Sequence, residues 1–325
     1  MALNLGANIM DRRGTKRTLD DAASSSSTEG KMLCDGVYSL HEPEGKPEVE
    51  IIFINGQSKQ GISTPYEKAY WTTWLARDGS SDNCWPKTWL AEEFPRARIL
   101  SVSYDVNLAL KSSESGTMDL YPVGETLVQE MVFPGVDIGQ NGCPVVCVCH
   151  DVGGLIAKQI VVMVHDKFKT NMEIQKLSYN IKGFFFYATP HGGSKFVTMD
   201  SEIGRLNSRF ERIQREVFHN RWKFMVVAEA HATAHNWTLF SSKIVEEHSG
   251  RYVGYDNVLH VSADHFDVCR PESTRSSSFL FLTQFSLFLR LFMNLRHKTK
   301  FSFFLLVWQR LMTLCHHLAR SWRTL

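Results

Sequence analysis

The sequence predicts an α/β protein with a mostly parallel central sheet and helices on both of its faces. Short apolar segments of strand character alternate along the chain with segments of helical character, a pattern typical of parallel sheets covered on both sides. One strand segment runs into a helix through a sharp, glycine-rich turn at residues 150–154. With 325 residues, 43% of them hydrophobic, the chain can form one large domain of roughly 200–250 residues plus tails.

The predicted strands are apolar runs rich in β-branched and aromatic residues. Helical periodicity appears at Gly124–Val132 and after the glycine-rich turn, and Ser201–Phe218 alternates charged and apolar residues as an exposed helix does. The strands are expected at Val49–Ile54, Ala97–Tyr104, Val145–Cys149, Ile181–Thr189, Trp222–Ala228, Lys243–Val245 and Val258–Ser262.

Three segments are predicted along the chain. Residues 1–45 are expected to form a flexible arm, because Ser24–Thr28 is of low complexity. Residues 46–292 are expected to form the α/β domain. Residues 293–325 are expected to form an apolar and basic tail.

The C-terminal region contains two apolar runs on either side of a basic stretch. The first run, Phe279–Leu295, contains Arg290, and its first half fits the last amphipathic helix of the core. The second run, Phe301–Leu314, is too short to span a bilayer and suits its interface. Peripheral membrane contact through the tail and a poorly packed tail are both open interpretations.

Composition excludes several classes of function. The net charge of +2 implies no general attraction to nucleic acid. The seven cysteines follow no disulfide or metal-ligand pattern, which favours reduced thiols in an intracellular, reducing compartment. Met1–Met10 has no apolar core of a secretory signal, so secretion is not expected. No metal site and no cofactor are predicted.

The segment Cys143–Ile160, C-P-V-V-C-V-C-H-D-V-G-G-L-I-A-K-Q-I, is the most informative in the chain. A buried strand, a tight turn and a helix in this order are typical of the nucleophile elbow, G-x-S-x-G, of α/β-hydrolases. Cys149 occupies the place of the first glycine, and Asp151 occupies the place of the serine. Asp tolerates the positive φ of that position better than most residues do. The sequence therefore predicts the fold more firmly than the chemistry.

Two further residues complete the expected catalytic order of nucleophile, acid and histidine. His265 follows the predicted strand Val258–Ser262 and is the candidate histidine. Glu229 follows the strand Trp222–Ala228 and is the candidate acid, in competition with Glu246 and Glu247.

Backbone N–H groups are expected to stabilise a developing oxyanion in such a site. One donor is predicted at Val152, directly after the elbow residue. The other is predicted in the loop after the first strand, at Gly56 or Gln57. Backbone donors survive changes of side chain, so this part of the site is expected to be intact.

Several motifs in chain order resemble the α/β-hydrolase family of the "serine active site containing protein", which is lipase-like. The resemblance covers roughly residues 49–288. It implies a serine esterase or lipase-like fold, a small-molecule or lipid-like substrate, and a place at mitochondrial or endoplasmic-reticulum membranes. The motifs that carry it are Phe53–Gly56, Trp89–Tyr104, His150–Gln159, Thr189–Ser194 (T-P-H-G-G-S) and Asp264–Pro271 (D-H-F-D-V-C-R-P).

The chemistry of a carboxylate at the elbow differs from that of a serine. Attack of Asp151 on an ester carbonyl would give a mixed anhydride, which is uphill, so ordinary ester hydrolysis is not expected. Attack on a saturated carbon would give an alkyl ester that water activated by His265 could open. The string H-D-x-G-G is similar to the elbow of epoxide hydrolases and haloalkane dehalogenases, which use this route.

Three hypotheses follow for function. The first is a hydrolase in which Asp151, His265 and Glu229 act on an epoxide or a related electrophile. The second is a catalytically inactive relative whose pocket binds a ligand or a partner. The third is residual esterase activity with His265 as a general base on water. Tyr66, Tyr70, Trp71 and Trp74 are expected to pack in the core, with a role near the substrate as the alternative.

Overall fold

We describe the chain from a computed structural model. The structure describes residues 29–57, 66–106, 119–140, 142–193, 201–219, 221–234, 241–250, 252 and 258–295. The tail from residue 296 onward and the low-complexity segment near residue 24 lie outside these residues.

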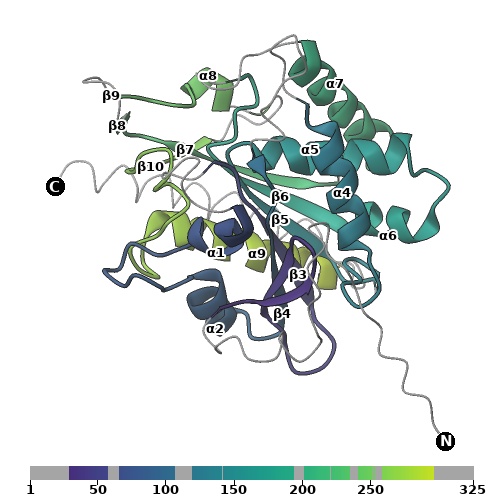
Figure 1. The fold of residues 1–325 in the computed structure, drawn as a ribbon, viewed down its shortest axis with the longest axis horizontal. Helices are drawn as coiled ribbons and strands as arrows, with labels where there is room; N and C mark the ends of the chain where they lie inside the picture. The colour runs from purple at the N-terminus through teal and green to yellow at the C-terminus, as the bar shows by residue number, and fades with distance from the viewer. Residues whose placement is uncertain are drawn as a thin grey trace, which may run out of the picture.

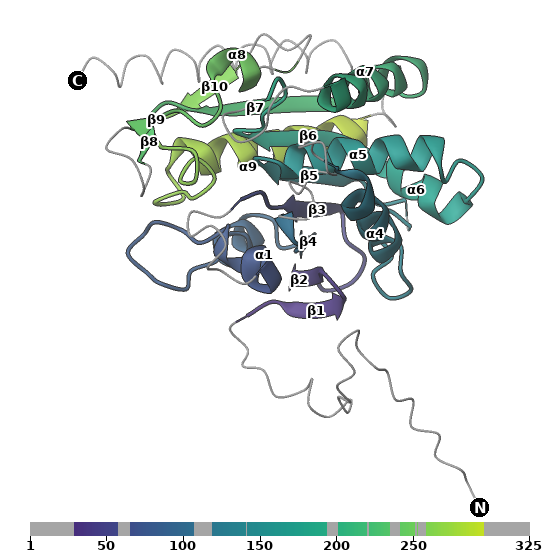
Figure 2. The same ribbon diagram turned by 45° about the horizontal axis from the view of Figure 1, so that its top comes forward.

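An eight-stranded sheet forms the centre of the molecule (Figures 1 and 2). Its strand order is β1-β2-β4-β3-β5-β6-β7-β10, with β1 antiparallel to β2, β2 antiparallel to β4, and every later pairing parallel. The strands are β1 Lys31–Cys34, β2 Val37–His41, β3 Val49–Ile54, β4 Ala97–Val102, β5 Val145–His150, β6 Ile181–Tyr187, β7 Lys223–Glu229 and β10 Val258–Val261. A separate small pair joins β8 Thr233–Ala234 to β9 Ser241–Ser242.

Helices cover both faces of this sheet, as the interleaved sequence pattern predicts (Figure 2). One face carries α4 Tyr121–Met131, α5 Gly153–Asp166, α6 Met172–Asn180 and α7 Ser201–Glu216. The other face carries the short helices η3 Tyr66–Lys68 (3₁₀), α1 Ala69–Thr72, η4 Pro86–Leu90 (π) and α2 Ala91–Glu93, together with α9 Ser277–Leu295. The short helix α8 Glu247–Gly250 lies beside β7. Because β3, β5 and β6 are apolar on both sides, the sheet separates two hydrophobic cores.

The sheet begins before residue 46, where the sequence predicted its start. Strands β1 and β2 fall within residues 1–45 and pair onto the edge at β4. Val37 and Leu40 of β2 are buried, so apolar burial holds this segment against the domain. At the other end, α9 runs three residues past the predicted boundary at 292.

One predicted strand is wrong. Lys243–Val245 does not join a sheet, and the two-residue strand β9 ends just before it. The N–H groups of Ile244 and Val245 bond to a buried side-chain carboxylate instead of a neighbouring strand. A β-branched run therefore acts here as an anchor for an acidic residue.

Candidate active site

The turn between β5 and α5 has the backbone of a strained elbow. Asp151 has a φ of 51°, in the left-handed region that few non-glycine residues adopt. Its N–H donates to the carbonyl of Tyr187 at the end of β6, which holds the turn at the sheet. A Cβ on Gly153 would lie 2.3 Å from the carbonyl oxygen of Ile54, so only glycine lets α5 begin this close to β3.

Because the strands are parallel, the candidate residues lie together at the carboxyl-terminal ends of β5, β7 and β10. Asp151 follows β5, Glu229 ends β7, and His265 follows β10. Nε2 of His265 lies 3.4 Å from Oδ1 of Asp151, and Nδ1 of His265 lies 2.9 Å from Oε2 of Glu229. All three residues are buried, with 1–2% of their surface exposed. The structure thus places the imidazole between two carboxylates.

Glu229 is the acid that contacts His265. Its other oxygen, Oε1, accepts the N–H of Ile244 at 2.7 Å and that of Val245 at 3.0 Å. These two bonds fix the position of the carboxylate. Of the competing acids, Glu246 is exposed and Glu247 begins α8.

The electrostatics of the cluster favour an ion pair. Burial lowers the pKa of His265, but the hydrogen bonds and charges of Asp151 and Glu229 outweigh it and raise that pKa to about 9. Burial raises the pKa of Asp151, but the hydrogen bond and charge of His265, together with the N–H of Gln57, lower it overall. Near neutral pH, Asp151 is therefore a carboxylate and His265 an imidazolium.

The candidate oxyanion donors surround Asp151. The N–H of Gln57 donates to Oδ2 of Asp151 at 3.0 Å. Gly56 passes so close that a Cβ there would lie 2.7 Å from the same oxygen. Val152 is buried at the N-terminus of α5. The loop after β3 is held by Tyr104, whose hydroxyl donates to the carbonyl of Asn55.

Two residues of this site were not among the predicted site residues. His150, the last residue of β5, contacts the carbonyl of His265 through Nε2 at 2.9 Å. The hydroxyl of Thr233 on β8 accepts the N–H of His265 at 3.1 Å. His150 stands beside the elbow residue in the motif, which would have singled it out, whereas no pattern marks Thr233.

A second polar cluster lies under α5. The side chain of Lys158 is completely buried, and its Nζ lies 2.7 Å from Nδ1 of His191 and 2.6 Å from Oδ1 of Asn207. Nδ2 of Asn207 donates to the carbonyl of His191 at 2.7 Å. Burial lowers the pKa of Lys158 to about 7. The cluster ties α5 to α7 and to the turn after β6.

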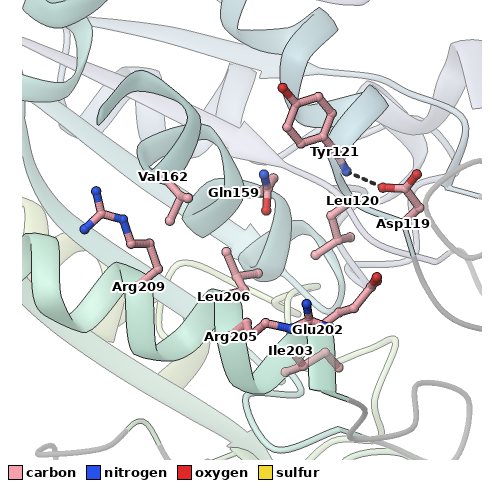
Figure 3. A pocket seen from close by; sticks show the side chains of 10 residues that line it. All are labelled: Asp119, Leu120, Tyr121, Gln159, Val162, Glu202, Ile203, Arg205, Leu206 and Arg209. Atoms are coloured by element: carbon pink, nitrogen blue, oxygen red, sulfur yellow. Dashed lines mark hydrogen bonds between the residues drawn. The ribbon is translucent and has the colours of Figure 1, made fainter. Parts of the chain in front are cut away.

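A cavity of about 290 Å³ opens between α4, α5 and α7 (Figure 3). Apolar side chains of Leu120, Val162 and Leu206 line part of it, and charged side chains stand around them. None of Asp151, His265 and Glu229 lines this cavity. The full lining is Asp119, Leu120, Tyr121, Gln159, Val162, Glu202, Ile203, Arg205, Leu206 and Arg209.

The aromatic residues before β4 pack mainly in the core. Trp74 is fully buried, with its ring edge-on to Phe53 at 4.8 Å, and Tyr70 stacks on Tyr38 at 3.6 Å. Trp71 packs partly against the same core, while Tyr66 is 43% exposed.

Neither a metal-binding cluster nor a membrane-spanning helix occurs in the described residues. Within them, no group of three or more His, Cys, Asp or Glu side chains is placed to hold a metal ion. No helix in the same part of the chain has the length and apolar character needed to cross a bilayer.

The chain is similar in sequence to proteins named SERAC1. It is 28% identical to the protein from Danio rerio over 274 residues, which cover 76% of this chain and 40% of that protein. The protein from Mus musculus is 29% identical over 61% of this chain and 30% of its own length. The protein from Homo sapiens is 30% identical over 52% of this chain and 26% of its own length. The matches thus span two fifths or less of each of these relatives. No family model matches the chain.

Solved structures with similar folds include a phospholipase, a lipase and an esterase. Phospholipase PlaB from Legionella pneumophila aligns with 73% of this chain and 59% of its own, at 10% identity and a TM-score of 0.49. Lipase BlEst2 from Bacillus licheniformis aligns with 76% of this chain and 97% of its own, at 13% identity and a TM-score of 0.41. A hyperthermophilic esterase from Pyrobaculum calidifontis aligns with 85% of this chain and 87% of its own, at 11% identity and a TM-score of 0.42.

The fold itself is decided by this chain's own topology. A parallel sheet with an antiparallel edge at β2, helices on both faces and an elbow after β5 form one arrangement. An acid at the end of β7 and a histidine after β10 lie at the same carboxyl-terminal end of the sheet as the elbow. The chain therefore has the α/β-hydrolase fold.

Proposed function

We propose that the protein is a hydrolase that forms an alkyl ester at Asp151 and then opens it with water. Its substrate is a small or lipid-like molecule with an electrophilic saturated carbon, such as an epoxide. The observation that carries this proposal is the position of the Asp151 carboxylate, which contacts both the N–H of Gln57 and the imidazole of His265.

In the first step, an Asp151 oxygen attacks the saturated carbon and the bond from carbon to the leaving oxygen breaks. The leaving oxygen departs on the side away from Asp151, so its proton comes from water. The low pKa of Asp151 supplies the nucleophile as a carboxylate at neutral pH. Formation of the ester removes the charge of Asp151.

Loss of that charge prepares the second step. Asp151 is one of the two groups that raise the pKa of His265, so esterification lowers that pKa and releases the proton to solvent. Neutral His265, oriented by Glu229, then takes a proton from the attacking water. The water oxygen bonds to the carboxyl carbon of Asp151.

The N–H of Gln57 has a defined role in this second step. Addition of water places negative charge on a carboxyl oxygen of Asp151, and Gln57 already donates to Oδ2 at 3.0 Å. A donor aimed where charge develops stabilises the transition state. Collapse of the intermediate expels the alcohol, which takes up the carboxyl proton, and restores the Asp151 carboxylate and the His265 imidazolium. Epoxide plus water yields a diol.

Two features argue against ordinary ester hydrolysis in the wild-type protein. Asp151 stands at the elbow position at which the similar lipase-like family carries serine, and its attack on an ester is uphill. While Asp151 keeps its charge, His265 stays protonated up to about pH 9 and cannot accept a proton from water. Direct general-base catalysis by His265 is therefore disfavoured near neutral pH.

The proposal is tested by the mass of the intact protein. Incubation with a panel of epoxides and alkyl halides should add one substrate mass at Asp151. The adduct should accumulate in His265→Gln, in which the second step is slowed, and should be missing in Asp151→Asn. The absence of any adduct in His265→Gln across the panel would overturn the proposal.

A second candidate function is the binding of a ligand or partner without turnover. Both carboxylate oxygens of Asp151 have partners, and the residue is only 2% exposed, which suits a neutralised, inert ion pair. Binding of a lipid-like molecule without adduct formation in any variant would favour this function.

The proposed location is a reducing intracellular compartment, at a mitochondrial or endoplasmic-reticulum membrane. In support, the six cysteines in the described part of the chain are all free thiols. Peripheral contact through the tail belongs to the same proposal. Fractionation of cells that express the full chain, with and without residues 293–325, tests it: recovery of both forms in the cytosolic fraction would contradict it.

A further inference from the structure

His150 lies at the junction of the candidate site. It is the last residue of β5 and directly precedes Asp151. Its side chain is 1% exposed, and its ring centroid lies 5.1 Å from that of His265. The proposed mechanism gives His150 no role, although it contacts the segment that carries the base.

The contact defines the protonation of His150. Nε2 lies 2.9 Å from the carbonyl oxygen of His265, and because a carbonyl only accepts, Nε2 carries the hydrogen. Nδ1 is buried and has no hydrogen-bond partner among the described residues. Burial, followed by the charge of His265, lowers the pKa of His150 to about 4. His150 is thus a neutral imidazole that donates from Nε2.

The main chain of His265 is held from two sides. Its N–H donates to the hydroxyl of Thr233, and its carbonyl accepts from His150. His150 and Asp151 are consecutive at the end of a buried strand, so they move as one unit. The hydrogen bond from His150 therefore connects the backbone of His265 to the unit that carries the carboxylate.

We propose that His150 is a positioning residue that keeps the imidazole of His265 at contact distance from the Asp151 carboxylate. Without the donor at Nε2, the His265 backbone keeps its hydrogen bond to Thr233 but loses its hydrogen bond to β5. The separation of 3.4 Å between His265 Nε2 and Asp151 Oδ1 would then no longer be fixed. The proposal rests on the roles of Asp151 and His265 under the proposed function.

Two polar substitutions separate this role from general packing. In His150→Gln the side-chain amide nitrogen lies near the former Nε2 and can still reach the carbonyl of His265. In His150→Asn the amide nitrogen lies near the former Nδ1 and falls short. Each variant places an uncharged amide in the same buried position, so they form a matched pair.

The test measures the electrostatic coupling of Asp151 to His265 by NMR titration of the His265 imidazole. In the wild-type background, Asp151→Asn should lower the proton affinity of His265 at least about tenfold, since it removes an opposite charge at contact distance. The same loss should appear in the His150→Gln background. In the His150→Asn background, the decrease in the pKa of His265 caused by Asp151→Asn should be less than half of the decrease in the wild-type background.

The outcomes decide the proposal. The proposal would be overturned if Asp151→Asn lowered the pKa of His265 as much in the His150→Asn background as in the wild type. It would also be overturned if this effect of Asp151→Asn were reduced equally in the His150→Gln and His150→Asn backgrounds. Folding of the Gln variant alone would support the need for a donor at Nε2, whereas failure of both variants to fold would refute a specific role for that donor. The readout is the protonation of His265, so it does not depend on turnover. A difference in coupling between the His150→Gln and His150→Asn backgrounds, with no adduct at Asp151, would contradict the proposed function and still support the positioning role of His150.

Discussion

The backbone N–H of Gln57 donates a hydrogen bond to the Asp151 side chain, with 3.0 Å between N and Oδ2. In an acyl-transfer enzyme such a donor would bind an oxygen of the substrate. Here it binds the protein's own carboxyl group. The contact holds the carboxylate in place, and under the proposed function it would also supply the donor for hydrolysis of an Asp151 ester.

Replacement of Asp151 by serine should convert the site to ester hydrolysis. The smaller side chain frees the N–H of Gln57 for a substrate carbonyl, and loss of the carboxylate lowers the pKa of His265 toward its ordinary value, so that it can act as a base. We expect Asp151→Ser to hydrolyse a short-chain p-nitrophenyl ester at least about tenfold faster than Asp151→Ala, since general-base catalysis contributes on the order of 10²–10⁴-fold.

The control for this gain is the double variant Asp151→Ser with His265→Gln. It should return to the rate of Asp151→Ala, because the serine then has no base. A folded Asp151→Ser variant with no gain would show that the N–H of Gln57 and the imidazole of His265 are not arranged for acyl transfer.

Replacement of Glu229 by glutamine should destabilise the protein and lower the pKa of His265. The amide cannot accept both the two backbone N–H groups and the N–H of the imidazolium, so a buried charge loses its partner. We expect a loss of about 3 kcal/mol in the free energy of unfolding, measured by urea denaturation. Glu246→Gln, at an exposed neighbouring acid, should change it by less than about 0.5 kcal/mol. Equal losses of unfolding free energy in Glu229→Gln and Glu246→Gln would show that Glu229 is not the partner of His265.

Replacement of Gly56 by alanine should displace the Asp151 carboxylate. The new Cβ would lie 2.5 Å from Cβ of Asp151 and 2.7 Å from its Oδ2. We expect a loss of roughly 2 kcal/mol or more of stability, together with loss of adduct formation. Gly204→Ala in α7, where a Cβ would meet nothing within 4 Å, should instead stabilise the helix by about 0.5–1 kcal/mol. A neutral effect of Gly56→Ala would contradict the described approach of the two segments.

Replacement of Lys158 by methionine should remove a contribution to stability that grows as the pH rises from 7. The folded pKa of Lys158 is about 7, below its ordinary value of 10.5, so protonation favours the unfolded chain. The contribution of Lys158 to stability is fully present above about pH 10.5 and is lost as pH falls toward 7. The wild-type protein should therefore gain stability relative to Lys158→Met between pH 7 and pH 10.

This comparison cancels the opposite trend of His265. Its pKa is raised from 6.5 to about 9, so its contribution is complete below pH 6.5 and declines as pH rises through 9 in both proteins. Unfolding in urea at several pH values provides the measurement. A constant difference between the two proteins across this range would show that Lys158 is charged in the folded state.

Much of the fold could be predicted from the sequence because strands buried on both faces of a parallel sheet are predominantly apolar. β3, β5 and β6 are mostly apolar, with Glu50 in β3, Lys182 in β6 and His150 at the end of β5 as the polar exceptions. The elbow was predictable because its geometry limits which residues fit there. The strands β1 and β2 were missed because they are short and only part of each strand is buried, with β1 at the edge of the sheet and β2 next to it. The opposite error arose at Lys243–Val245, because a run of three residues is too short for its pattern to separate a strand from a loop.

The sequence by itself determined the order of the elements and a list of candidate residues, since periodicity and turn chemistry are local properties of the chain. Only the tertiary structure decided that Glu229 rather than Glu246 contacts His265, and that Gln57 donates to Asp151. It alone placed His150 against the carbonyl of His265, 115 residues away. Such contacts depend on the register of strands far apart in the chain, which is fixed by packing of the whole sheet and not by any local pattern.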